Sequence, residues 1–270
     1  MSESNSAGLW IEEARGLLDH IEATQTASIS TLAEWCADTI HGGGLVHLFG
    51  SGHSRVPVEE AFPRYGSFPG FNPIIELSMT FHTEIVGTNG QRQAMFIERV
   101  EGLAEVILSN FNFGDDDIMV VFSSSGRSAV PIEMASGSRD RGLRVVAVTS
   151  VAESMARPSG HSSGKRLLDH ADLVIDIGTP PGDALVTLEG LETPIGPGST
   201  LANAAVVNEL KVRVAELLLA RGTTPVVLTS SSLVGPERSE ELFDLAYADH
   251  SHRLAKVIDK GATVNGDHRR

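Results

Sequence analysis

The chain has 270 residues, 41% hydrophobic and 21% charged, the balance of an ordinary globular protein. Its formal net charge of −14 argues against a nucleic-acid-binding surface, where clustered lysine and arginine dominate. That charge does not exclude a small anionic ligand, because local hydrogen-bond donors decide such binding. Cys36 is the single cysteine, which excludes an internal disulfide and a cysteine-built zinc site. The polar N-terminal segment and the lack of a long apolar stretch predict a cytoplasmic protein without a membrane partner.

Helical and strand patterns alternate along the chain. Apolar residues spaced by three and four predict a long N-terminal helix over about 7–41, ended by the glycines at 42–44. Short continuous apolar runs predict buried parallel strands. The expected strands are 45–49, 118–122, 144–148, 173–177 and 225–228, with a further short segment near 73–77. The expected later helices are about 54–62, 98–110, 129–141, 200–221 and 240–258.

This alternation predicts an α/β fold, a three-layer α/β/α sandwich with a mostly parallel, five-stranded, doubly wound sheet. No internal repeat or composition break divides the chain. We therefore expect one domain over 1–270, with a C-terminal helix and a polar tail over about 236–270. Ligands of such sheets bind at the carboxyl ends of the strands, so the turns after the strands are the candidate site.

Two of these turns are rich in glycine and serine. Gly50-Ser51-Gly52-His53-Ser54 follows the strand 45–49, and Ser123-Ser124-Ser125-Gly126-Arg127-Ser128 follows the strand 118–122. Free N–H groups and hydroxyls at such turns favour an anion, and a following helix adds its dipole. We interpret the pair as a divided cradle for a phosphate group. The alternative is that the serines only cap two helices, a position that serine favours in any protein.

Neither turn has the pattern of a nucleotide-binding loop. The first turn lacks the third glycine of the dinucleotide fingerprint, and no acidic residue follows at the required offset. No Gly-Lys-Ser/Thr sequence follows a strand, so the phosphate-binding loop of the NTPases is absent from the sequence. We expect neither a cofactor nor a metal ion in this protein.

Taken together, the two turns resemble those of the SIS (sugar isomerase) phosphosugar-binding family, which pairs Gly-x-Gly-x-Ser with Ser-x-Ser-Gly-x-Ser/Thr. The resemblance covers about residues 9–230. The long first helix and the lack of a helix-turn-helix resemble stand-alone members of the family, and the segment 161–167 looks like a less-characterised branch. The resemblance implies the SIS fold, and it implies a sugar phosphate as the ligand. The matching positions are Gly50, Gly52, Ser54, Ser123, Ser125, Gly126 and Ser128. The predicted substrate-binding residues of the two turns are Gly52, His53, Ser54, Ser123, Ser124, Ser125 and Ser128.

The resemblance also implies a catalytic glutamate a few turns after the first serine. The ungapped position is Arg64 in this chain, whereas an alignment with one gap places Glu60 there. Glu60 lies almost two helical turns beyond Ser54, so we take it as the candidate base. The alternative is an exposed acidic pair with Glu59. Arg64 is a candidate clamp for a phosphate or carboxylate.

His161 is the second catalytic candidate. It lies in a long loop between predicted strands, where catalytic groups concentrate, and an imidazole can open a sugar ring or move a proton. Lys165 and Asp183 are weaker candidates in loops of the same kind. For each of the three, a purely structural role is the alternative.

The implied reaction is aldose–ketose isomerisation of a sugar phosphate through an enediol. Two alternatives remain open. Gly198-Ser199-Thr200 looks like a segment of the family's etherase branch, which suggests lyase or etherase chemistry and adds Ser199 and Thr200 as substrate-binding candidates. Arg64 at the usual glutamate position instead suggests a catalytically silent phosphosugar sensor.

The N-terminal helix predicts self-association. Its apolar stripe is long for a helix that covers only one domain, so we expect a homodimer or a higher homo-oligomer. The stripe consists of Ile11, Leu17, Leu18, Ile21 and Ile29.

Overall fold

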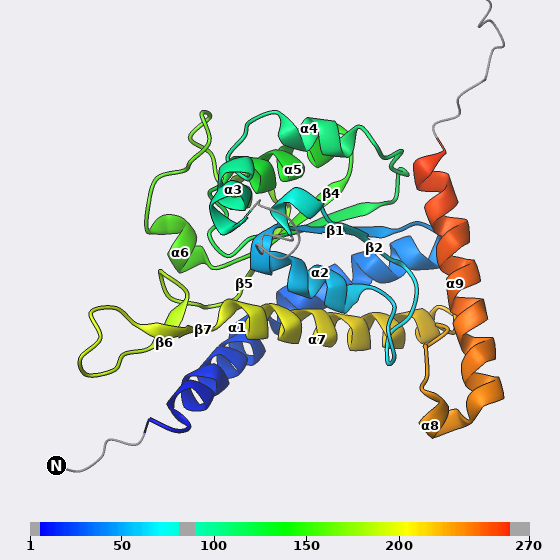
Figure 1. Ribbon diagram of the computed structural model, residues 1–270. Helices are drawn as coiled ribbons and strands as arrows, with labels where there is room; N and C mark the ends of the chain where they lie inside the picture. The colour runs from blue at the N-terminus through cyan, green and yellow to red at the C-terminus, as the bar shows by residue number, and fades with distance from the viewer. Residues whose placement is uncertain (1–5, 81–89, 260–270) are drawn as a thin grey trace, which may run out of the picture.

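The computed structural model describes residues 6–80 and 90–259. Its centre is a five-stranded parallel sheet with the order β2-β1-β3-β4-β5 (Figure 1). The strands are β1 (Val46–Gly50), β2 (Phe71–Ile74), β3 (Ile118–Phe122), β4 (Arg144–Thr149) and β5 (Leu173–Asp176). Strands β1 and β3 are buried over their whole length, as their continuous apolar runs predict. The predicted α/β fold with a five-stranded sheet is confirmed.

Two sets of helices cover the two faces of the sheet. Helices α1 (Leu9–His41), α2 (Arg55–Ala61) and α7 (Ser199–Ala220) share one core with strand residues such as Val120. Helices α4 (Leu103–Leu108) and α5 (Ala129–Asp140) share the second core with alternate strand residues such as Val121. Side chains that alternate along each strand therefore fill two separate cores. Helices α1 and α7 lie side by side along the first face (Figure 1).

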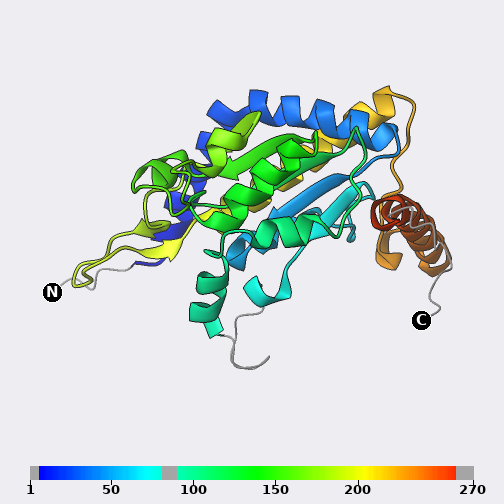
Figure 2. The same ribbon diagram turned by 90° about the horizontal axis from the view of Figure 1, so that it is seen from above.

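Further elements lie at the two ends of the sandwich. A two-stranded antiparallel hairpin of β6 (Ala184–Val186) and β7 (Ile195–Pro197) lies at one end, and α9 (Pro236–Ile258) lies at the other (Figure 2). The polar tail expected after α9 falls, from residue 260 on, outside the described residues. The remaining elements are η1 (Gly52–Ser54), η2 (Leu77–Met79), α3 (Gly90–Ile97), α6 (Val151–Met155), η4 (Leu167–His170) and α8 (Ser231–Val234). In the described parts of the chain, no helix has the length and apolarity needed to cross a membrane.

The structure corrects two predicted elements. The helix expected over 98–110 is shorter: residues 98–102 are not helical, and α4 begins after Gly102, which takes a left-handed conformation (φ 87°). The strand expected over 225–228 does not join the sheet. Its Leu228 only exchanges two backbone hydrogen bonds with Gly66 and Ser67. The fifth strand is instead β2, which pairs with β1.

The apolar stripe of α1 mostly faces this chain's own core. Leu17, Ile21 and Ile29 are buried in the core that α1 shares with the sheet and α7. Ile11 and Leu18 are exposed. The stripe is therefore largely used within one chain, and only its two exposed members are available to a partner.

Candidate functional site

The two Ser/Gly turns lie next to each other at the carboxyl edge of the sheet. Strands β1 and β3 are neighbours, with Gly50 opposite Phe122, so the chain leaves both strands at the same level. Glu98 joins the two turns directly. The Ser51 hydroxyl donates to Glu98 Oε1 at 2.6 Å, and the Ser128 hydroxyl donates to Glu98 Oε2 at 3.2 Å. The two turns therefore lie together, and their role as one phosphate site remains a prediction.

The glycine that opens the first turn is needed by the turn itself. A Cβ atom on Gly50 would lie 2.1 Å from the carbonyl oxygen of Ser54. In the second turn, Gly126 has a φ of 56°, and a Cβ there would lie 3.1 Å from Thr149 Oγ1. Both glycines therefore let the backbone close tightly after its strand.

The serines of the turns do not cap the helices that follow. Ser54 and Ser128 are the N-cap residues of α2 and α5, yet neither side chain accepts a hydrogen bond from its helix. The Ser128 hydroxyl donates to Glu98 instead. Within the described residues, no hydrogen bond occupies the hydroxyl of Ser54 or Ser125, so both are available to a ligand. The interpretation of these serines as ordinary caps is not supported.

Two cavities open at this edge. The smaller, of about 300 Å³, is lined by Ser54, by the three serines 123–125 and by Glu98, Glu153, Gly182 and Asp183. The larger, of about 460 Å³, shares Glu98, Ser124 and Asp183 with it. The larger cavity also has an apolar wall that includes Met79, Ala94 and Met95, and it contains Gly52 and the exposed His53. The site thus combines a hydroxyl-rich part with a more apolar part.

Charged side chains surround the smaller cavity. Arg127, in the second turn, contacts Glu153 with 2.7 Å between Nη2 and Oε1, and the amide of Gly182 donates to Glu153 Oε2 at 2.6 Å. Asp183 has a positive φ of 59°. Arg127 itself lines neither cavity, and its ion pair with Glu153 connects the second turn to α6.

Asp183 connects the site to α7. The Ser199 hydroxyl donates to Asp183 Oδ2 at 2.5 Å, and the Ser199 amide donates to Oδ1 at 2.8 Å. The predicted substrate-binding residue Ser199 therefore reaches the cavities only through Asp183. Thr200, the next residue of α7, lines neither cavity.

Glu60 and Arg64 lie apart from the cavities. Glu60 Oε2 accepts a hydrogen bond from Arg64 Nη1 at 2.7 Å, and Oε1 contacts Asn208 and Lys211 on α7. Burial alone would raise the pKa of Glu60, but hydrogen bonds from Asn208 and Arg64 and the charge of Lys211 lower it overall. The structure does not bring either residue to the turns, and their catalytic and binding roles remain predictions.

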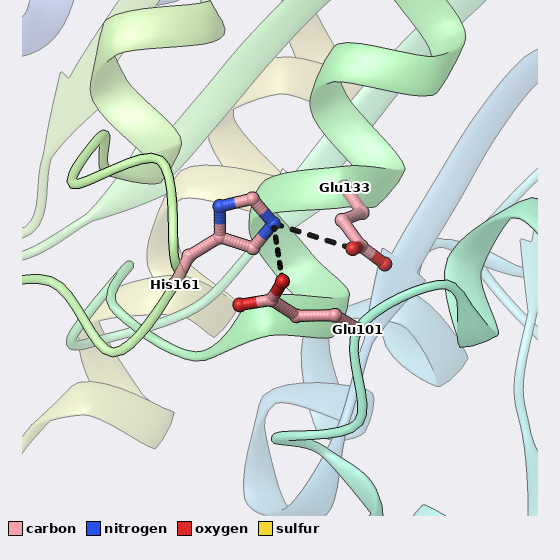
Figure 3. A group of neighbouring side chains, drawn as sticks. All are labelled: Glu101, Glu133 and His161. Atoms are coloured by element: carbon pink, nitrogen blue, oxygen red, sulfur yellow. Dashed lines mark hydrogen bonds and ion pairs between the residues drawn. The ribbon is translucent and has the colours of Figure 1, made fainter.

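His161 is held in a different cluster. Its Nε2 lies 3.2 Å from Glu133 Oε1 and 3.9 Å from Glu101 Oε2, and it lines neither cavity (Figure 3). Hydrogen bonds from the hydroxyl and amide of Ser162 lower the pKa of Glu101. The structure therefore gives His161 two carboxylate partners in place of a position beside the turns.

Glu98 and Glu153 were missed by the sequence analysis. The sequence pattern places Glu98 at the start of a regular helix, whereas in the structure Glu98 directly follows the end of α3 and α4 begins only at Leu103. Glu153 has a local signal, because it lies three residues after Ser150, whose hydroxyl accepts from the Glu153 amide. That pattern predicts a helix start, but it does not predict that the carboxylate lines a cavity.

A doubly wound parallel sheet with two Ser/Gly turns at one cavity defines the class of α/β proteins that bind small polar ligands at the carboxyl edge of the sheet. The family model of the SIS domain matches residues 9–150. The chain therefore belongs to the SIS domain family, which confirms the resemblance inferred from the two turns.

Relatives match over most of the chain. A UPF0309 protein of Streptomyces griseus is 35% identical over 235 residues, which cover 87% of this chain and 92% of that protein. A UPF0309 protein of Oceanobacillus iheyensis is 32% identical over 238 residues, covering 88% of this chain and 94% of that protein. The solved structure of a phosphoheptose isomerase from Francisella tularensis matches 80% of this chain and 100% of its own, with a TM-score of 0.52 and 16% identity. That structural likeness shows a shared fold.

Proposed function

We propose that this chain is a cytoplasmic enzyme that binds a sugar phosphate between the two turns and interconverts its aldose and ketose forms through an enediol. The single observation that carries the proposal is the bridge of Glu98 between Ser51 and Ser128, beside unoccupied serine hydroxyls. Membership of the SIS domain family and the fold shared with a phosphoheptose isomerase support the same reaction class.

The phosphate group is assigned to the hydroxyl-rich cavity. Ser54 and Ser125 supply free hydroxyls, and the start of α5, a 12-residue helix, adds the positive end of its dipole. Arg127 lies in the second turn and balances the charge of Glu153, one of the carboxylates that line this cavity. Holding the phosphate here keeps the reacting carbons in a fixed position, so binding far from the reacting bond contributes to rate.

Glu98 is our candidate for the proton-transfer base. It lines both cavities, so it faces a ligand whose phosphate occupies one and whose carbon chain enters the other. In the reaction, the carboxylate removes the proton from the carbon next to the carbonyl, and the resulting enediol takes that proton back on the former carbonyl carbon. The second proton moves between the two oxygens of the enediol. Glu60 and His161, the candidates from sequence, are secondary because neither lines a cavity.

A catalytically silent phosphosugar sensor is the second candidate function. The observation that favours it is the engagement of Glu60 by Arg64 and Lys211, which leaves no carboxylate free at the position where the family's glutamate is expected. A sensor needs the phosphate cradle but no base. Lyase or etherase chemistry, suggested by Ser199 and Thr200, is the third candidate function. Such a reaction would release a second product.

Proton exchange separates these functions. The full-length protein is first screened by thermal shift against a panel of sugar phosphates, and the stabilising ligand is then incubated in D₂O and followed by NMR. An isomerase exchanges the proton at C1 or C2 through the enediol, even when net conversion is small. Tight binding without exchange or product identifies a sensor and contradicts our proposal, and release of a second product identifies a lyase or etherase.

A homodimer is a further part of the proposed function. The N-terminal end of α1 contacts the hairpin, where Trp10 Nε1 donates to Pro197 O at 3.2 Å. Exposed apolar side chains lie on both elements, at Ile11 on α1 and at Leu191 and Ile195 on the hairpin. Burial of such side chains favours association of two chains. Light scattering at micromolar concentration is expected to give twice the chain mass, and a monomer would contradict the expectation.

A further inference from the structure

Three potential metal ligands from separate segments meet at one corner of the molecule. Glu101 lies between α3 and α4, Glu133 lies on α5, and His161 lies in the loop after α6. Their ligand atoms all lie within 4.8 Å of one another, and Figure 3 shows the carboxylates directed toward the same edge of the imidazole ring. The side chains of Glu133 and His161 are 18% and 15% exposed, and that of Glu101 is 41% exposed. The cluster is therefore partly shielded and still reachable from solvent.

Each carboxylate is oriented by its own hydrogen bonds. The amide of Gly102 donates to both oxygens of Glu133, at 2.9 and 2.8 Å. The amide and the hydroxyl of Ser162 donate to the two oxygens of Glu101, at 2.6 and 2.7 Å. Metal-binding carboxylates are held in this manner by outer partners, because such bonds fix the direction of the oxygens before the ion arrives.

The cluster carries excess negative charge. Across residues 6–80 and 90–259, no lysine or arginine forms an ion pair with Glu101 or Glu133, whose only basic neighbour is His161. Two carboxylates around one imidazole therefore lack a full positive charge to balance them. A divalent cation would balance both carboxylates at once.

We propose that Glu101, Glu133 and His161 bind one divalent transition-metal ion of the Zn²⁺ class. One nitrogen and two oxygen ligands suit zinc, which leaves a fourth position for water. Bonds of about 2.1 Å in a tetrahedral site place neighbouring ligand atoms roughly 3.4 Å apart. The present separations of 3.2 and 3.9 Å from His161 Nε2 bracket that value, and all three ligand atoms lie within 4.8 Å of one another, so side-chain shifts can close the site around an ion.

The imidazole has an outer partner as well. Ser163 lies beside Nδ1, with its hydroxyl at 2.7 Å and its amide at 3.1 Å. When Nε2 binds the ion, the ring proton lies on Nδ1, and the Ser163 hydroxyl accepts it. This completes the usual arrangement in which the second nitrogen of a metal-bound histidine is hydrogen-bonded. The Ser163 residue is exposed, so water replaces the bond that its amide loses.

The ion would add one shared centre to three segments that hydrogen bonds already connect. The turn at 98–102 also carries Glu98, three residues before Glu101, so the metal would stiffen the segment that positions Glu98. The inference does not depend on sugar-phosphate binding, because none of the three ligands lines the two cavities. It also departs from our expectation, based on sequence, that the protein contains no metal.

The test is a calorimetric titration of the full-length, chelator-treated protein with Zn²⁺. We expect about one ion per chain, and at least 100-fold weaker binding in Glu133→Gln and in His161→Gln. Ser163→Ala is expected to weaken binding by roughly tenfold, as for other outer partners. Glu105→Gln is the matched control, since Glu105 is an exposed carboxylate on α4 that pairs with Arg141 outside the cluster, and it should bind like the wild type.

Absence of Zn²⁺ binding in the wild type, or unchanged binding in the variants, would overturn the site. If Glu133→Gln fails to fold, Glu101→Gln replaces it, because Glu101 is the most exposed ligand and its loss leaves the core intact. Stabilisation of each variant by the sugar phosphate is measured in parallel. If Zn²⁺ does not bind but the sugar phosphate still stabilises the protein, only the metal site is wrong. If Zn²⁺ binds but no sugar phosphate stabilises the protein, only the proposed function is wrong.

Discussion

Two glutamates, Glu60 on α2 and Glu98 after α3, show how different surroundings separate a structural carboxylate from a catalytic candidate. Glu60 is neutralised by Arg64 and Lys211, which hold it between α2 and α7. Glu98 has no such ion pair among the described residues; it accepts hydrogen bonds from two serines and lines both cavities. A carboxylate bound by cations stabilises the fold, whereas one that is bound only by hydroxyls beside a cavity remains able to accept a proton.

The largest expected effect is on turnover. Glu98→Gln keeps the shape of the side chain and removes its basicity, so turnover should fall by about 10²–10⁴-fold while sugar-phosphate binding survives. Glu60→Gln is the matched control and should leave turnover within about threefold, since it removes no group from the cavities. Rates and binding are measured on the same preparations. A large loss of turnover in Glu60→Gln, with unchanged turnover in Glu98→Gln, would show that Glu60 and not Glu98 is the base.

The next effect is on binding. Ser54→Ala combined with Ser125→Ala should weaken sugar-phosphate binding by roughly 1–3 kcal/mol, because charge-assisted hydrogen bonds to the phosphate are lost. Ser136→Ala, on α5 and outside both cavities, is the control. Unchanged affinity of the double variant in calorimetry would show that the phosphate does not bind at these two hydroxyls.

The smallest effect is on stability and concerns Glu60. Its lowered pKa means that the folded state favours the charged carboxylate. This contribution is present above the unfolded value of 4.5 and is lost as the pH falls through the lower pKa of the folded state. Glu60→Gln should therefore cost about 1 kcal/mol at pH 7, and the difference from wild type should shrink in acid. Denaturant unfolding at pH 7 and pH 3 measures it, and a constant difference would show that charge is not the cause.

Sequence patterns predicted the elements whose signal is local. The strands at 118–122 and 144–148 are buried on both faces except at Arg144, so their continuous apolar runs predict them directly. The strand β2 was indistinct because it contains Asn72 and Pro73 and lies at the edge of the sheet. The apolar run 225–228 also predicts a strand, but in the structure its Leu228 bonds to Gly66 and Ser67 and the segment is not part of the sheet.

The candidate site was predictable only in part. The Ser/Gly turns are visible because strand, glycine and serine follow one another in sequence. Glu98 is not visible, because its role depends on hydrogen bonds with Ser51 and Ser128, which are distant in sequence. The spacing of Glu60 from Ser54 suggests a catalytic role. That spacing does not show that the Glu60 carboxylate pairs with Arg64 and Lys211. Tertiary contacts therefore separate the two glutamates where sequence spacing cannot.

The most direct test of the central claim is a crystal structure of the Glu98→Gln variant with the sugar phosphate that stabilises the wild type. We predict the phosphate against the hydroxyls of Ser54 and Ser125, with C1 or C2 of the sugar within about 3–3.5 Å of the side chain at position 98. A phosphate bound at Arg64, with the sugar carbons beside Glu60, would contradict the account.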